Sequence, residues 1–275
     1  MSAALSTGIV WFKNTDLRLM DNAVIKSSHE DSSDVFHTYI IDPQTFLSPT
    51  AISNNCKYSM KRFEFLSQTL EDLHKKLCNV GNKLHIFVGP SEVVLEKLMT
   101  SLLVNPTLYF HDEYIHEEKL LVSKVMRSIP STHRRVKTYW GGGTLFEPSD
   151  LSYPLEELGP FTIFRQEMEK LQIREPLPLP DVMKPSPNLD EAMCAHLGLL
   201  SCMTSQSIFR SLTEVALACG AQEDPLFQSG SFPCLYTGGE SAALERLDYY
   251  ITQGKLICFI MTIAQQHFNT IFYIT

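Results

Sequence analysis

The densest group of side chains able to do chemistry lies between residues 111 and 118. It contains two histidines and four carboxylic acids: His111, Asp112, Glu113, His116, Glu117 and Glu118. A zinc site needs three or four ligands in fixed geometry, and neither an HExxH pattern nor a Cys–His pairing is present. Glu117 and Glu118 also suit the first turn of a helix, where acids favour the helix dipole. We favour that helix start and predict no metal site.

Three other polar segments also follow apolar runs: residues 13–18, residues 42–43, and the glycines 141–143 with Thr144. In an open parallel sheet, ligands bind beyond the carboxyl ends of the strands. The glycines could cradle a phosphate, but no GxGxxG or GKS/T pattern is present, and an extended stretch follows them instead of a helix. We therefore favour a flexible turn there. No Ser/His/Asp or Cys/His arrangement can be defended from spacing, so we predict no catalytic residue.

The elements that must position these segments alternate between short apolar runs and helical patterns. Strands are predicted at residues 8–12, 35–41, 84–88, 107–111 and 136–140. The strongest helical pattern runs from Lys57 to Cys78, and five apolar residues fall on one stripe of it: Phe63, Leu66, Leu70, Leu73 and Leu77. Strands that alternate with helices indicate parallel right-handed crossovers. The predicted fold is α/β: a five-stranded open parallel sheet wound with helices on both faces, then a long connector and a short helical remnant.

The chain divides into three predicted parts: an α/β domain at 1–170, a connector at 171–236, and the start of a helical domain at 237–275. Five prolines between residues 175 and 188 indicate an extended connector. A last helix is predicted from Glu240 to Tyr250. Too little periodic apolar sequence follows residue 175 to build a second independent core.

Composition and charge limit the classes of function. Hydrophobic residues make up 44% and charged residues 20% of the 275 residues, which is ordinary for a folded protein. Residues 1–150 hold 16 Lys and Arg against 17 Asp and Glu, and residues 151–275 hold 7 against 14. A duplex-binding surface needs clustered basic residues, so we predict weak or no DNA binding by this chain. Seven scattered cysteines and no visible targeting peptide predict an intracellular protein of the cytoplasm or nucleus, without a membrane span.

The opening run resembles a known family signature. Residues 9–22, IVWFKNTDLRLMDN, are similar to the photolyase/cryptochrome pattern WFRNDLRLxDN, with Thr15 as an extra residue and Lys13 in place of the usual arginine. Four later segments resemble the cryptochrome-DASH branch. Residues 111–118 are similar to HEEVxxEE, residues 140–146 to WGSTLYH, residues 161–165 to YTQFR, and residues 232–247 to FPCxGGExxALxRL.

The resemblance implies an α/β antenna domain followed by a helical domain that holds FAD. With that flavin, family members repair pyrimidine dimers in DNA or sense blue light. The segments that would open the FAD domain, YKETRNGM and STKFSPWLA, do not follow Tyr250, and residues from about 251 onward do not resemble the family. We therefore expect a truncated chain, without a FAD site and inactive alone.

The resemblance also implies an antenna chromophore, such as a reduced folate, in the groove between the two domains. Glu113 matches the position whose carboxylate hydrogen-bonds the pterin ring, and a plain acid at a helix start is the alternative explanation of this residue. A non-catalytic nucleotide- or folate-binding module with a regulatory or interaction role is the alternative function. The apolar side chains of the last helix, including Leu244, Leu247 and Tyr250, and of the tail beyond it predict self-association.

Overall fold

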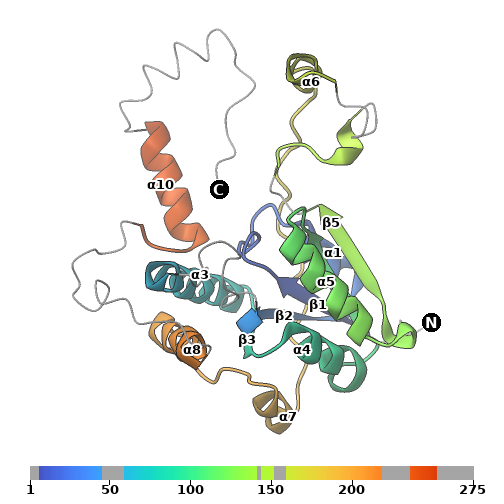
Figure 1. The fold of residues 1–275 in the computed structure, drawn as a ribbon, viewed down its shortest axis with the longest axis vertical. Coiled ribbons are helices and arrows are strands. Elements are labelled where there is room, and N and C mark those ends of the chain that lie inside the picture. Colours follow the sequence, from blue (N-terminus) through green and yellow to red (C-terminus); the bar gives the residue numbers. More distant parts are fainter. Residues whose placement is uncertain (1–5, 45–58, 141–143, 152–158, 219–235, 253–275) are drawn as a thin grey trace.

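Five parallel strands form one sheet in the order β3-β2-β1-β4-β5 (Figure 1). They are β1 Thr7–Phe12, β2 Asp34–Ile41, β3 Leu84–Val88, β4 Thr107–Asp112 and β5 Val136–Trp140. The computed structural model describes residues 6–44, 59–140, 144–151, 159–218 and 236–252. The chain runs from β1 outward to β3 and then crosses back to β4, so the strand order reverses beside β1. This reversal leaves a crevice between the carboxyl ends of β1 and β4.

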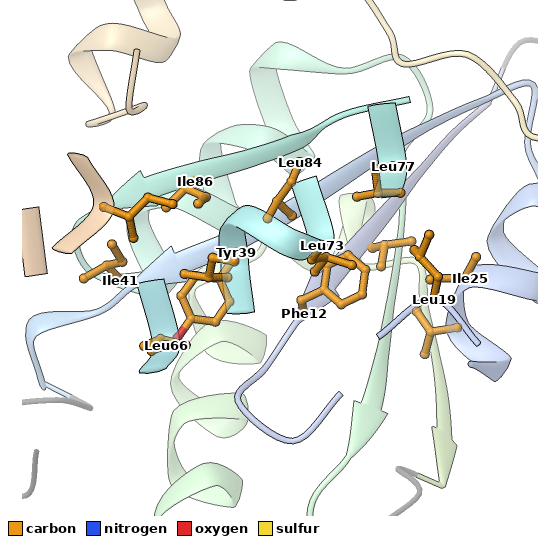
Figure 2. Close-up of a cluster of buried hydrophobic side chains, with 14 of the residues drawn as sticks. Phe12, Leu19, Ile25, Tyr39, Ile41, Leu66, Leu73, Leu77, Leu84 and Ile86 are labelled. Carbon is orange, nitrogen blue, oxygen red and sulfur yellow. The ribbon is translucent and has the colours of Figure 1, made fainter. Parts of the chain in front are cut away.

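Helices cover both faces of the sheet, and the predicted α/β fold is confirmed. In β1, Val10 and Phe12 belong to one buried cluster, whereas Ile9 and Trp11 belong to the other. The first cluster, shown in Figure 2, is completed by α1 (Ala23–Asp31), α3 (Met60–Asn79) and α8 (Ser205–Ala218). The second is completed by α4 (Ser91–Lys97), α5 (His116–Ser128) and α7 (Glu191–His196). Because both of its faces are buried, β1 has an unbroken apolar run from Ile9 to Phe12, whereas the edge strand β5 is partly exposed.

The remaining helices are short or lie beyond the sheet. They are the π-helix η1 Leu98–Leu102, the 3₁₀-helices η2 Ser131–His133 and η3 Pro148–Asp150, and the α-helices α6 Phe161–Met168 and α10 Glu240–Thr252. Of the described residues, no helix has both the length and the apolar character needed to cross a bilayer.

The sequence predicted α3 well and α1 and α8 poorly. All five residues of the predicted α3 stripe are buried, and Ser59 caps the helix by accepting a hydrogen bond from the Arg62 amide at 3.4 Å. The buried face of α1 includes Ser28 and His29, so its apolar periodicity is too weak to find. In α8, Ile208, Leu212 and Ala216 recur every four residues and are buried in the first cluster. Part of the predicted connector therefore completes the core.

The proline-rich segment is extended and bonded to the α/β domain at several points. The Val35 amide donates to the Pro185 carbonyl at 2.9 Å, and the Asp21 amide donates to the Leu177 carbonyl at 3.2 Å. The Leu177 amide in turn donates to Asp21 Oδ1 at 3.0 Å. Proline removes its own donor but not its carbonyl, so such a segment can still accept backbone hydrogen bonds.

One buried relay of hydrogen bonds ties this segment to the core through two histidines. The Lys184 amide donates to His29 Nδ1 at 2.9 Å, His29 Nε2 and His37 Nε2 lie 3.2 Å apart, and His37 Nδ1 lies 3.1 Å from Asn82 Oδ1. A backbone amide can only donate, so His29 Nδ1 accepts from Lys184 and the His29 proton lies on Nε2. His29 Nε2 then donates to His37 Nε2, and His37 Nδ1 donates to Asn82 Oδ1. Each ring therefore carries one proton and is neutral. Asn82 Nδ2 completes the loop by donating to the Lys184 carbonyl at 2.8 Å.

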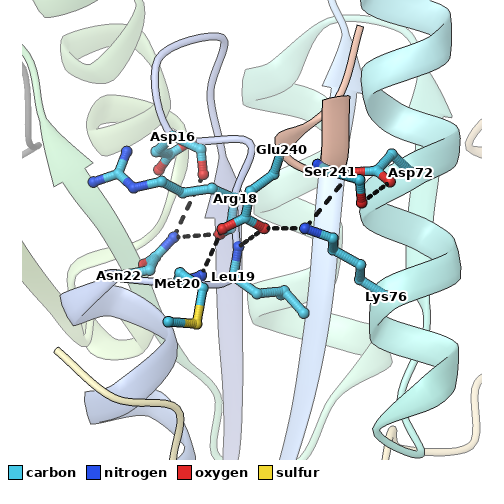
Figure 3. A network of polar contacts seen from close by, with 9 residues as sticks. All are labelled: Asp16, Arg18, Leu19, Met20, Asn22, Asp72, Lys76, Glu240 and Ser241. Carbon is cyan, nitrogen blue, oxygen red and sulfur yellow. Dashed lines mark hydrogen bonds and ion pairs between the residues drawn. The ribbon is translucent and has the colours of Figure 1, made fainter. Parts of the chain in front are cut away.

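The start of α10 is held against α3 and the loop after β1 (Figure 3). Glu240 accepts hydrogen bonds from the amides of Leu19 and Met20, both at 3.0 Å, and its carboxylate lies 2.8 Å from Lys76 Nζ. The preceding Gly238 admits no side chain, because a Cβ there would lie 2.0 Å from the Phe65 carbonyl oxygen. Further along α10, Leu244, Leu247 and Tyr250 are exposed. Residues 253–275, the other part of the predicted apolar surface, lie outside the described residues, and self-association stays a prediction.

Acid should destabilise the fold through the histidine relay. Burial lowers the pKa of His29 to about 4 and that of His37 to about 3, from an ordinary value of 6.5. The unfolded chain therefore binds more protons, and the free energy of unfolding should fall as pH drops from 6.5 toward 4. The slope is roughly 1.4 kcal/mol per pH unit for each such histidine. Urea titrations at pH 7 and pH 5 should show a smaller difference for His37→Phe than for the exposed control His116→Gln. Equal differences would contradict the relay.

Removing the charge of Glu240 should release the start of α10. Glu240→Gln offers one acceptor oxygen where two now bind, and it leaves Lys76 without its ion pair, so the contact should weaken by about 1–3 kcal/mol. Hydrogen exchange of the Leu19 and Met20 amides and of the first turn of α10 should then become faster. The matched control is Glu245→Gln, on the exposed surface of the same helix. Unchanged exchange in Glu240→Gln would show that other contacts hold the helix.

Candidate functional site

Three of the polar segments predicted from the sequence meet where β1, β2 and β4 end. They are the loop from Lys13 to Arg18, the turn at Asp42, and residues 111–113. The pocket between them has a volume of about 50 Å³. Its walls come from all three strand ends, and they include Trp11, Lys13, Thr15, Tyr39, Asp42 and Glu113. The glycines 141–143 of the fourth segment lie outside the described residues.

Lys13 is a buried cation at the centre of this edge, with 8% of its surface exposed. Its Nζ donates to the His111 carbonyl at 2.8 Å and lies 4.6 Å from the ring centroid of Phe110 and 5.1 Å from that of Trp11. Burial lowers the pKa of Lys13, and the negative charge of Glu113 acts in the opposite direction. The two rings and the carbonyl thus replace part of the water that the ammonium loses.

Asp16 joins the end of β1 to the end of β4. Its Oδ1 accepts a hydrogen bond from the Lys13 amide at 2.7 Å, and its Oδ2 lies 2.8 Å from His111 Nδ1. Both side chains are 2% exposed or less. Because a carboxylate can only accept, Nδ1 of His111 carries a proton.

Glu113, the residue singled out from the sequence, is buried beside Lys13. Thr15 donates a short hydrogen bond to Glu113 Oε1, and Oε2 has no hydrogen-bond partner among the residues that the structure describes. Burial raises the pKa of Glu113, whereas the Thr15 hydroxyl and the Lys13 charge act to lower it. Helix α5 begins at His116, so the acids of its first turn are Glu117 and Glu118, and Glu113 precedes the helix.

Residues 111–118 do not converge on one point. His111 and Glu113 are buried in separate hydrogen bonds, whereas Asp112, His116 and Glu117 are exposed. Within the described ranges, no group of three or more His, Cys, Asp or Glu side chains could hold a metal ion.

Two residues of this site lie in segments that the sequence predicted, but the sequence does not show what they bind. Thr15 is an extra residue relative to the family motif, and its hydroxyl donates to Glu113. Asp42 accepts hydrogen bonds from the amides of Ser91 at 2.8 Å and Gln44 at 2.9 Å, so it connects the end of β2 to the start of α4. In the sequence, the pair Asp42-Pro43 indicates the end of a strand, but it does not indicate which residues Asp42 binds.

The chain is similar to known proteins along most of its length. Residues 8–183 match the family model for DNA photolyase. The cryptochrome DASH of Xenopus laevis is 29% identical over 254 residues, 90% of this chain and 44% of that protein. The blue-light photoreceptor PHR2 of Arabidopsis thaliana is 27% identical over 90% of this chain and 50% of its own length. The chain thus spans about half the length of these relatives.

Solved structures agree with the sequence matches. The cryptochrome of Synechocystis sp. PCC6803 superposes with a TM-score of 0.71 and 26% identity, over 95% of this chain and 49% of that one. The archaeal photolyase of Sulfolobus tokodaii, solved with two FAD molecules, has a TM-score of 0.55 and 20% identity, over 95% of this chain and 58% of that one, and shows the shared fold.

Removing the Thr15 hydroxyl should raise the pKa of Glu113 further. The hydroxyl donates to the ionised carboxylate and stabilises that form, and Thr15→Val keeps the side-chain shape without the donor. An NMR titration of ¹³C-labelled glutamate carboxyls should show the Glu113 midpoint at higher pH in Thr15→Val and near the wild-type value in Thr15→Ser. An equal midpoint in the valine and serine variants would mean that the hydroxyl does not bind Glu113 in solution.

Proposed function

The chain belongs to the DNA photolyase family, and we propose that its α/β domain is the antenna-binding part of a cryptochrome-DASH-type flavoprotein. The antenna would be a reduced folate or a similar pterin. The observation that carries this proposal is the buried Glu113 carboxylate, which Thr15 orients and whose Oε2 has no partner among the described residues. The pocket that it lines lies at the reversal of strand order, where open α/β sheets bind their ligands.

The donor and acceptor groups of this pocket suit the amino-pyrimidine edge of a pterin. A carboxylate accepts hydrogen bonds from neighbouring N–H groups, and Glu113 keeps acceptor capacity after Thr15 has bound. Trp11 and Tyr39 supply aromatic walls. A volume of about 50 Å³ takes the ring edge with its amino group rather than the whole ring system. When bound, the chromophore supplies light absorption, and the residues of this chain hold and orient it.

The described residues do not themselves fit a flavin. The pockets at the sheet edge have volumes of about 140 and 50 Å³, whereas sites for molecules of this size are typically ~300–1,000 Å³. We therefore assign no FAD contact to these residues and derive no electron transfer from them. Repair of pyrimidine dimers and photoreception are both activities of whole family members, and we propose them only for a protein that also supplies a flavin site.

Charge supports the proposal that these residues contribute little to DNA binding. The chain carries a formal net charge of −8, and the excess of acids lies in residues 151–275. Contact with phosphate requires clustered lysine and arginine, which replace the counterions of the nucleic acid. The alternative, a regulatory folate-binding module, shares the Glu113 pocket and would also act without DNA.

The proposed antenna site is tested by folate binding. Purified chain should bind 5,10-methenyltetrahydrofolate, followed by its absorbance and fluorescence after gel filtration. Glu113→Gln should weaken binding by about tenfold or more, because one acceptor becomes a donor that faces the N–H groups of the ligand. The matched control Glu117→Gln, at an exposed acid of α5, should bind as the wild type does. Equal binding by both variants, or no binding by the wild type, would refute the assignment.

A further inference from the structure

A second pocket, of about 140 Å³, shares no lining residue with the pocket beside Glu113. It lies between the loop after β1, the end of β5 and the segment at 173–177. Its walls include two basic groups, one aromatic ring and several apolar side chains: Arg18, His111, Trp140, Leu145, Ile173 and Leu177. Asp16, which holds both the Lys13 amide and the His111 ring, connects the two pockets.

His111 lines this pocket, and the orientation of its ring is fixed. Its Nδ1 is bound to Asp16, so the ring cannot rotate without losing a buried hydrogen bond. Its Nε2 has no hydrogen-bond partner among the described residues, and His111 is one of the residues that line the pocket. A buried carboxylate that orients an imidazole in this way fixes one tautomer and one direction. When the ring is neutral, Nε2 is an acceptor, and a ligand can then bind it with an N–H or O–H donor.

Arg18 supplies hydrogen-bond donors to the same pocket. Its Nη2 donates to the Asp21 carbonyl at 3.0 Å, and the other N–H groups of the guanidinium have no hydrogen-bond partner among the described residues. Figure 3 shows the guanidinium pointing away from Glu240 and Lys76. The other arginine of the pocket, Arg174, forms ion pairs with Glu147 and Asp150.

The charge and shape of the pocket restrict the ligand further. The carboxylates of Asp21, Glu147 and Glu175 line it and disfavour a phosphate or another anion. The Trp140 ring is fixed by a hydrogen bond from Nε1 to Thr144 Oγ1 at 2.8 Å, and it stacks near Tyr114. With apolar side chains on the remaining walls, the pocket suits a flat, uncharged ring.

We propose that this second pocket binds an uncharged heteroaromatic ring with an imide edge, an N–H between two carbonyl groups, as in a uracil-type nucleoside. The imide N–H donates to His111 Nε2, a flanking carbonyl accepts from Arg18, and the ring lies against Trp140. This site goes beyond the antenna proposal, because it uses different residues and does not require a folate.

Calorimetric titration of the full chain with uridine tests the proposal. We expect a dissociation constant on the order of 1 mM or below, since a ligand of this size has few atoms with which to gain affinity. The analogue 3-methyluridine lacks the imide N–H, and it should bind at least about tenfold more weakly, because His111 Nε2 would be buried without a donor. This comparison leaves the protein unchanged, so folding defects cannot explain its result.

Variants then test whether uridine binds in this pocket. Arg18→Met should weaken uridine binding by about tenfold, whereas Arg210→Met, at an exposed arginine of α8, should bind as the wild type does. Circular dichroism checks that each variant is folded. The proposal is overturned by any of four results: no uridine binding by the wild type, equal affinity for 3-methyluridine, an Arg18→Met variant that binds normally, or much tighter binding of uridine monophosphate, which would indicate an anion site.

Discussion

The candidate site depends on one buried carboxylate, Asp16. Strands β1 and β4 are neighbours in the sheet, but almost a hundred residues separate them in the chain, and their ends must be held together beyond the last backbone pair. Asp16 does this by accepting from the Lys13 amide on its own loop and from His111 on the other strand. A buried carboxylate is costly unless its oxygens are bonded. Both oxygens of Asp16 accept hydrogen bonds, so its burial is compensated. The carboxylate thereby holds the loop after β1 and the end of β4 in a fixed relative position.

A second buried polar group next to Asp16 is Lys13, and the two differ in how they are compensated. Asp16 is satisfied by hydrogen bonds alone, whereas Lys13 relies on a carbonyl, two aromatic faces and the negative charge of Glu113. Burial lowers the pKa of Lys13 and raises that of Glu113, so burial favours the neutral form of each, and their mutual attraction favours the charged forms. The charge of the pocket beside Glu113 depends on the balance between burial and this mutual attraction. The hydrogen bond from Thr15 lowers the pKa of Glu113 and so favours its ionised form.

The sequence predicted the elements in which large apolar residues dominate the buried face, and it missed elements in which this pattern is weak. Helix α3 was predicted because large apolar residues repeat along it with the helical period, and the strands were predicted as short apolar runs. Helix α1 was missed because Ser28 and His29 occupy its buried face, and no pattern in one sequence tells a buried histidine from an exposed one. Glu113 belongs to a polar cluster that the sequence shows, but only the family resemblance singled it out within that cluster. The pairing of Asp16 with His111 joins residues 95 positions apart, and the chain fold alone brings them together.

The family motif continues from β1 into the loop at residues 13–22, and successive residues of this loop contact different parts of the structure. Asp16 binds His111 at the sheet edge, and the amides of Leu19 and Met20 bind Glu240 at the start of α10. Further along, Asp21 pairs with Leu177 in the proline-rich segment, and Asn22 caps α1 through the Ile25 amide at 3.1 Å. Each position serves a different element, so a substitution at one is not compensated by its neighbours. A short loop thus positions the sheet edge, a helix start and two distant segments, which explains why the resemblance is most specific here.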